Sequence, residues 1–149
     1  MLTTDFLEPS DGVRILMIGP RDEDRDALRK IFARSQWNIC PVRSIAEATE
    51  FLRSTTVPVV ICERYLPDGT WKDVLEEIAL TVPAPQLIVT ARHADESLWG
   101  EVLALGAYDV LAKPFCAPEV FRTISLAWRH WNHSWQRVGA PPIALAAAL

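Results

Sequence analysis

Short apolar runs alternate with segments of helical periodicity along most of this chain, and this alternation restricts its fold more than any other feature. The runs Val13–Ile18, Val59–Cys62 and Leu87–Val89 are almost continuously apolar, as expected for strands that are buried on both faces. A segment with apolar residues on one helical face follows each run, at intervals of roughly 25 residues. Repeated strand–helix units of this kind predict a parallel sheet with helices on both faces.

Two weaker strands and five helices complete the prediction. Trp37–Val42 predicts a strand at the sheet edge, because Pro41 within it cannot donate a backbone hydrogen bond. A short strand is expected at residues 109–112, and helices are expected near residues 22–33, 45–52, 71–78, 95–105 and 118–135. Ser44 is the expected N-cap of the second helix. This order predicts an α/β fold of the flavodoxin-like (βα)5 type, a doubly wound parallel sheet with strand order 2-1-3-4-5.

Length and composition fit one globular domain. The 149 residues suffice for a single core, and we expect a domain over residues 13–136 between tails at residues 1–12 and 137–149. A net charge of −4 argues against nucleic-acid binding by this chain alone. The sequence shows neither a secretory leader nor an apolar run of membrane-spanning length, so we expect a cytoplasmic location without membrane attachment.

Candidate functional residues lie where the predicted strands end. In an open parallel sheet, ligands bind beyond the carboxyl ends of the strands, near the point where the strand order reverses. The predicted strand ends place five positions there, namely Gly19, Pro20, Glu63, Thr90 and Lys113.

The segments around these positions occur in an order that is specific to one family. They are Leu66–Gly69 after the third strand, Thr90-Ala91 at the end of the fourth, and Lys113-Pro114-Phe115 after the fifth. With these segments, residues 13–130 closely resemble the receiver domains of bacterial response regulators, which act in phosphorelay (two-component) signalling. The resemblance implies an acidic pair that binds Mg²⁺, an aspartate that accepts the phosphoryl group, and a hydroxyl and a lysine that bind its oxygens.

The chain departs from this family pattern at two places. Thr90 and Lys113 match the phosphoryl-binding positions, but Glu63 stands at the phospho-acceptor position, where its extra methylene moves the carboxylate by more than about 1 Å. Gly19 and Pro20 stand where the acidic pair belongs, and neither side chain can ligate a metal. We therefore expect a pseudo-receiver that is not an enzyme, needs no cofactor and does not undergo ordinary aspartyl phosphorylation.

Several interpretations of this site stay open. We expect an ion pair between Glu63 and Lys113, which is either a relic of a lost site or a permanent mimic of the phosphorylated state. Asp22, Glu23 and Asp24 are expected to form the acidic first turn of a helix. In an alternative, Asp22 or Glu23 restores Mg²⁺ binding in a divergent, phosphorylatable receiver. A flavodoxin-like domain that binds a small ligand is a further alternative, disfavoured because no glycine-rich phosphate loop follows the first strand.

The aromatic residue of the receiver switch is also missing. Receivers commonly carry an aromatic side chain three residues before the lysine, whereas this chain has Val110. Tyr108 is expected to face the same side of the strand but to lie further along it. We therefore do not expect the usual tyrosine-coupled switch.

The last predicted helix carries an aromatic seam with spacings of 3, 4, 3 and 4: Phe121, Ile124, Trp128, Trp131 and Trp135. The first part of this seam is expected to pack on the sheet. An interface is expected at its other end, formed by Trp131 and Trp135 with Trp128 at its border. The expected occupant of that interface is a second copy, a signalling partner such as a histidine kinase or an output protein, or the chain's own tail. His130 and His133 are expected on a solvated face and not in a metal site.

Overall fold

A computed structural model describes residues 13–137, apart from the side chains of residues 135–137. Five parallel strands form the central sheet in the order β2-β1-β3-β6-β7, which confirms the predicted fold class and strand order. These strands are β1 (Arg14–Ile18), β2 (Asn38–Val42), β3 (Val59–Glu63), β6 (Gln86–Ala91) and β7 (Asp109–Ala112). β2 is an edge strand, as Pro41 predicted. The tails predicted at residues 1–12 and from residue 138 onward lie outside the described residues.

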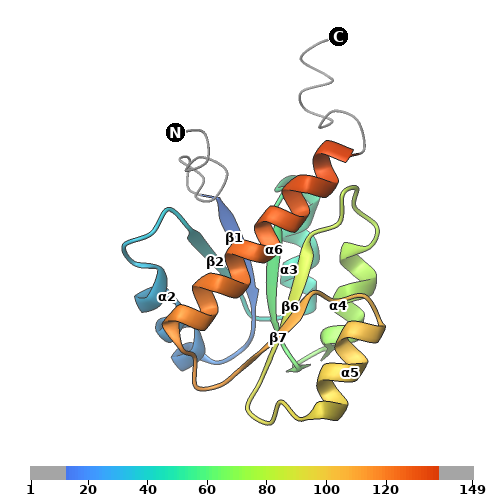
Figure 1. The fold of residues 1–149 in the computed structure, drawn as a ribbon. Helices are drawn as coiled ribbons and strands as arrows, with labels where there is room; N and C mark the ends of the chain where they lie inside the picture. Colours follow the sequence, from blue (N-terminus) through green and yellow to red (C-terminus); the bar gives the residue numbers. More distant parts are fainter. Residues whose placement is uncertain (1–12, 138–149) are drawn as a thin grey trace.

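Five helices follow the strands at the predicted places. They are α2 (Asp22–Phe32), α3 (Ile45–Ser54), α4 (Trp71–Ile78), α5 (Glu96–Ala104) and α6 (Ala117–Arg137). A small antiparallel hairpin of β4 (Tyr65–Leu66) and β5 (Gly69–Thr70), which the sequence analysis did not predict, joins β3 to α4. Figure 1 shows α6 crossing the front of the sheet, with α3 behind the strands. No helix within residues 13–137 is both long and apolar enough to cross a membrane.

The sheet has a separate hydrophobic core on each face. Residues of α3, α4 and α5 pack on one face, and residues of α2 and α6 pack on the other. Successive residues of β3 alternate between the two cores: Val60 faces the first, and Val59 and Ile61 face the second. Burial on both faces explains why the strands have continuous apolar sequences.

Two side chains fix where α3 begins. The Ser44 hydroxyl accepts a hydrogen bond from the Glu47 N–H at 3.2 Å, which confirms the predicted N-cap of α3. Asp68, in the turn between β4 and β5, accepts hydrogen bonds from the N–H groups of Ile45 at 2.9 Å and Ala46 at 3.0 Å. These two bonds hold the pKa of Asp68 below its usual value. The hairpin after β3 is therefore tied to the start of α3.

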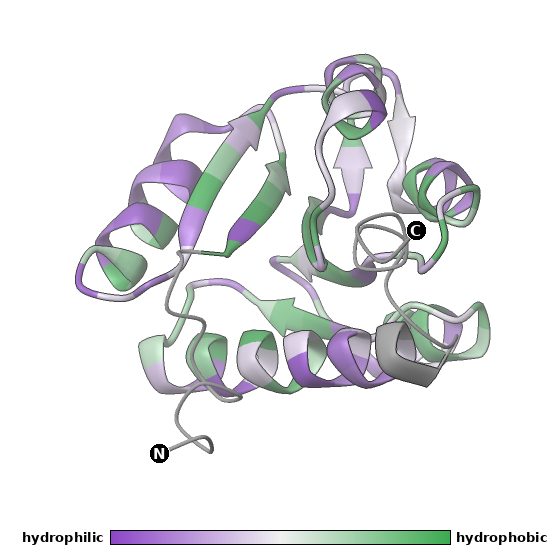
Figure 2. Ribbon diagram, turned by 90° about the horizontal axis from the view of Figure 1, so that it is seen from above, coloured by the Kyte–Doolittle hydropathy of each residue, from purple (hydrophilic) through white to green (hydrophobic). Residues whose placement is uncertain are grey.

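The seam of α6 is buried over its first half. Ile124 is fully buried and Trp128 is 8% exposed, with the Trp128 ring edge-on to Trp37 at a centroid distance of 6.3 Å. Phe121 is partly buried and packs against the core beneath α6. Figure 2 shows hydrophobic and hydrophilic residues alternating along α6. Trp131 is partly buried, and the side chain of Trp135 lies outside the described residues, so the interface predicted there stays a prediction.

Candidate functional site

Strand alternation and register bring the predicted site residues to one edge of the sheet. Glu63 follows Ile61 by two residues in β3, so both point toward the side covered by α2 and α6. Glu63 pairs with Thr90 across the sheet. Gly19 lies beside it, because a Cβ built on Gly19 would lie 3.7 Å from the Glu63 Cβ. The Lys113 N–H donates to the Ala91 carbonyl at 3.0 Å, which continues the β6–β7 register to the same edge.

The ammonium group of Lys113 holds two carboxylates. Its Nζ contacts Glu63 Oε1 and lies 2.6 Å from Asp24 Oδ2. The Lys113 side chain is only 6% exposed, and those of Asp24 and Glu63 are 13% and 16% exposed. The Glu63–Lys113 ion pair predicted from the sequence is therefore confirmed. A third group, Asp24, joins it from α2.

Asp22, Glu23 and Asp24 form the acidic first turn of α2, as predicted. Within this turn, Asp22 and Asp24 differ in what they contact. Successive helical residues are rotated by about 100°, so Asp22 and Asp24 point to nearly opposite sides of the helix. Asp24 turns toward Lys113, whereas Asp22 binds arginines at the surface. Asp24, and not Asp22 or Glu23, is thus the acidic residue that returns to the site.

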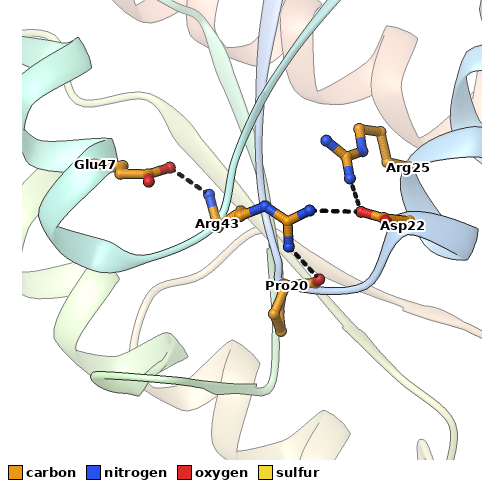
Figure 3. Close-up of polar contacts among 5 residues, drawn as sticks. All are labelled: Pro20, Asp22, Arg25, Arg43 and Glu47. Carbon is orange, nitrogen blue, oxygen red and sulfur yellow. Dashed lines mark hydrogen bonds and ion pairs between the residues drawn. The ribbon is translucent and has the colours of Figure 1, made fainter.

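Arg43 fixes the loop between β1 and α2, where the family's acidic pair would lie. Its guanidinium donates to the Pro20 carbonyl oxygen at 2.9 Å and to Asp22 Oδ1 at 2.8 Å (Figure 3). Asp22 also binds Arg25, and the backbone N–H of Arg43 donates to Glu47 Oε1 at 2.8 Å. The Pro20 carbonyl oxygen and the Asp22 carboxylate are therefore already engaged by arginines.

These residues do not fit a magnesium ion. Mg²⁺ requires oxygen ligands in a near-octahedral arrangement and usually binds one or two carboxylates that are free to ligate it. Gly19 and Pro20 offer no side-chain oxygen, and the carboxylates of Asp24 and Glu63 both contact the Lys113 ammonium. Within residues 13–137, no group of three or more His, Cys, Asp or Glu side chains is arranged to hold a metal ion.

Burial controls the protonation of Glu63. Removal from water raises the pKa of its carboxyl above the usual value, the contact with Lys113 opposes this rise, and the nearby Asp24 carboxylate adds to it. The Asp24 carboxylate contacts the same ammonium and makes ionisation of Glu63 less favourable. The cluster is thus short of positive charge.

Thr90 and the switch positions are placed in the interior. Thr90 is 3% exposed, and its hydroxyl donates a long hydrogen bond of 3.5 Å to the Cys62 carbonyl. Val110 is 1% exposed in the core beneath α3, α4 and α5. Tyr108 packs instead in the core on the other face, with its ring 5.6 Å from that of His130. The expectation that Tyr108 faces the same side as Val110 is therefore wrong. β7 begins only at Asp109, so the strand alternation does not extend back to Tyr108.

Sequence reasoning missed a group of cations around the site. A pocket of about 160 Å³ lies beside Glu63 and is also lined by Arg21, Arg64, Tyr65, Ala91, Arg92 and His93. A neighbouring hollow of about 330 Å³ is lined by Asp24, Arg92, Lys113 and Pro114. The signal was present in the sequence, because an arginine directly follows Pro20, Glu63 and the Thr90-Ala91 segment.

Comparison with known proteins identifies the family. The family model of the response regulator receiver domain matches residues 15–125 of this chain. The chain belongs to this family. It is therefore a receiver domain of the kind that works in two-component signalling, although its acceptor and metal-binding positions differ from the family pattern.

Named relatives agree with this assignment. The swarming motility regulation protein RssB of Serratia marcescens is 36% identical over 102 residues, which cover 66% of this chain and 45% of that protein. The signal receiver domain of a putative Luxo repressor protein from Vibrio parahaemolyticus matches with a TM-score of 0.78 and 20% identity, over 86% of this chain and 98% of that chain. The beryllofluoride-activated NtrC4 receiver domain dimer matches with a TM-score of 0.73 and 22% identity, over 79% and 98%. The two structures support the fold, and the chain spans less than half the length of RssB.

Removing Lys113 tests the ion cluster. Lys113→Ala leaves two partly buried carboxylates facing each other, and we expect it to lower the free energy of unfolding by about 3 kcal/mol. Adding Glu63→Gln should recover part of this loss, with a coupling energy above about 1 kcal/mol in a double-mutant cycle measured by urea unfolding. As a control, Lys72→Ala removes an exposed ion pair with Glu101 and should cost less than about 1 kcal/mol. Absence of coupling between positions 63 and 113 would show that the two groups do not meet.

The raised pKa of Glu63 predicts a pH dependence of stability. A carboxyl whose pKa is raised by folding stabilises the folded state below its ordinary pKa of 4.5, and this contribution is lost as the pH rises through the raised value. Glu63→Gln has no carboxyl group to ionise at this position, so the variant does not lose stability in this way. The variant should therefore gain stability relative to wild type as the pH rises from about 4.5 through the raised pKa of Glu63. Urea unfolding across this range measures the difference, and a relative gain toward acidic pH would contradict the account.

Proposed function

We propose that this receiver domain signals by binding a protein partner and does not undergo ordinary aspartyl phosphorylation. One observation carries the proposal: the Lys113 ammonium is already bound by the Glu63 and Asp24 carboxylates at the edge where the family binds a phosphoryl group. The glutamate at the acceptor position is thus engaged inside the protein. The proposal assigns the chain no enzymatic activity.

The chemistry of phosphoryl transfer supports this proposal. Catalysis of that transfer depends on positioning of the nucleophile and on stabilisation of charge, commonly by Mg²⁺. The acceptor carboxylate is displaced by its longer side chain, and Gly19 and Pro20 provide no metal ligand. An error of about 1 Å in position already costs orders of magnitude in rate. The displaced carboxylate therefore impairs positioning of the nucleophile, and the missing metal ligands impair stabilisation of charge.

The charge at Lys113 supports a permanent mimic over a relic. A phosphoryl group carries a charge of about −1.5 to −2 at neutral pH. The sequence alone offered one carboxylate, Glu63, but Asp24 brings a second to the same ammonium. When both are ionised, the two carboxylates approach the charge that Lys113 would meet in a phosphorylated receiver. This state needs no donor and no metal.

The expected partner is another signalling protein in the cytoplasm. A histidine kinase and an output protein both fit this role, and a second copy of the chain fits the partly buried aromatic end of α6 around Trp131. The NtrC4 receiver domain, a structural neighbour, forms a dimer in its beryllofluoride-activated form. A homodimer is therefore one form that the interaction of this chain can take.

A divergent but phosphorylatable receiver is the rival, because Asp24 and Glu63 do bring two carboxylates together. Incubation with acetyl phosphate and Mg²⁺, followed by intact mass, separates the two. We expect no stable labelling of wild type or of Glu63→Asp, and some labelling of Gly19→Asp/Pro20→Asp/Glu63→Asp, which restores both acceptor and metal ligands. Labelling of wild type on Glu63 would make the proposal wrong.

A further inference from the structure

The sequence from residue 120 onward carries positive charge only. Residues 120–149 contain three arginines, two histidines and three of the six tryptophans of the chain, but no aspartate or glutamate, although the whole chain has a net charge of −4. Residues 138–149, which lie outside the described residues, contain no polar side chain. A cationic helix that is rich in tryptophan and is joined to an apolar segment is typical of proteins that bind at membrane surfaces.

The topology brings further cations to the end of the domain where α6 ends. Helices that connect parallel strands run antiparallel to them, so α2 and α6 both end near the amino ends of the strands, opposite the edge that carries Lys113. Arg14 begins β1, and Lys30 and Arg34 lie in and just after the last turn of α2, with all three side chains exposed. Arg129 is exposed about two turns before α6 ends. Within residues 13–137, no carboxylate forms an ion pair with any of these four cations.

Apolar side chains are exposed at the same end. Leu80 and Val82, in the loop between α4 and β6, are 79% and 74% exposed, more than any other large hydrophobic residue in the described part of the chain. Figure 1 shows this loop and the end of α6 beyond the amino ends of the strands. Trp131 of α6 is only partly buried, and Glu76 of α4 is exposed about one turn before Leu80. The cationic part of this end is therefore formed by α2, β1 and α6. We call the following residues together the amino-end surface: Arg14, Lys30, Arg34, Leu80, Val82, Arg129 and Trp131.

An anionic membrane fits the amino-end surface better than a second copy of the chain does. In a symmetric dimer the same patch of both copies meets, which would bring two sets of unpaired cations together. Anionic lipids neutralise such cations, and tryptophan rings are favoured at the boundary between headgroups and acyl chains. Residues 138–149 have no side chain that can form a hydrogen bond, and an apolar segment enters a bilayer surface without needing specific contacts.

We propose that the amino-end surface binds reversibly to the surface of a membrane that contains anionic lipids. Its cations attract the headgroups, while Trp131, the loop of Leu80 and Val82, and residues 138–149 enter the boundary with the acyl chains. This differs from the expectation of no membrane attachment, because binding at the surface needs neither a leader nor a membrane-spanning run. In this orientation the edge that carries Lys113 faces away from the membrane and stays accessible to a signalling partner. The inference goes beyond the proposed function and does not require it.

Co-sedimentation of the full chain with vesicles tests the inference. One set of vesicles contains phosphatidylglycerol in phosphatidylcholine, and the other contains phosphatidylcholine alone. We expect saturable binding to the anionic vesicles and much weaker binding to the neutral ones. Added salt should weaken the binding, because it screens the charges.

Two variants separate the charged and the apolar contributions. Lys30→Gln/Arg34→Gln/Arg129→Gln should weaken binding to anionic vesicles by about tenfold or more, since each cation near an anionic surface strengthens binding by up to about fivefold. Deletion of residues 138–149 should weaken the binding that remains at high salt, because burial of apolar groups is not screened. Thermal unfolding checks that each variant is folded.

Arg21→Gln/Arg64→Gln/Arg92→Gln is the matched control. It removes the same charge from residues that lie after β1, β3 and β6, at the opposite end of the strands, and should leave vesicle binding unchanged. Absence of vesicle binding, equal binding to both kinds of vesicle, or equal weakening by the two triple variants would overturn the inference. A dimer that forms through the amino-end surface without vesicle binding would overturn it as well and assign the surface to a second copy. Phosphoryl labelling plays no part in these assays, so this inference and the proposed function can fail separately.

Discussion

The contact of one buried ammonium group with two carboxylates is the interaction on which the rest of the candidate site depends. Lys113 lies at the end of β7, Glu63 at the end of β3 and Asp24 on α2, so the ion cluster joins three elements at the carboxyl edge of the sheet. A buried charge of this kind is costly unless it is paired. The three groups therefore depend on one another, because Lys113 is the shared partner of both carboxylates.

Two centres of opposite character follow from this arrangement. The inner centre, Asp24, Glu63 and Lys113, is largely closed to solvent and carries excess negative charge. The outer centre is the open pocket lined by Arg21, Arg64 and Arg92, where positive charge is in excess. The family combines a metal, an acceptor and a phosphoryl-binding lysine at one point. This chain has an internal charge cluster at Lys113 and, beside it, a pocket lined by three arginines.

The fold and part of the site were predictable from the sequence, because both depend on local periodicity. Strand alternation and strand order place Glu63 and Lys113 at one edge without further information, and the structure brings them into contact. The rotation of α2 about its axis was not predictable in this way. It is set by how Leu28 and Phe32 pack into the core, and it decides that Asp24 and not Asp22 reaches Lys113.

Other features escaped prediction for related physical reasons. Tyr108 precedes β7, so a period of two could not be applied to it. The hairpin of β4 and β5 has only two residues in each strand, too few for a pattern to show. The arginines after three strand ends each resemble ordinary surface residues in the sequence. They become a group only when parallel strands bring Arg21, Arg64 and Arg92 to one pocket.

A crystal structure grown with Mg²⁺ and beryllofluoride, a phosphoryl analogue, tests the central claim most directly. The account predicts that the Lys113 Nζ lies within hydrogen-bond distance of both the Asp24 and Glu63 carboxylates, with neither a metal ion nor a beryllofluoride group on Glu63. A magnesium ion ligated by Asp24 and Glu63, with Lys113 turned to a beryllofluoride group, would contradict it and show that the receiver is competent for phosphorylation.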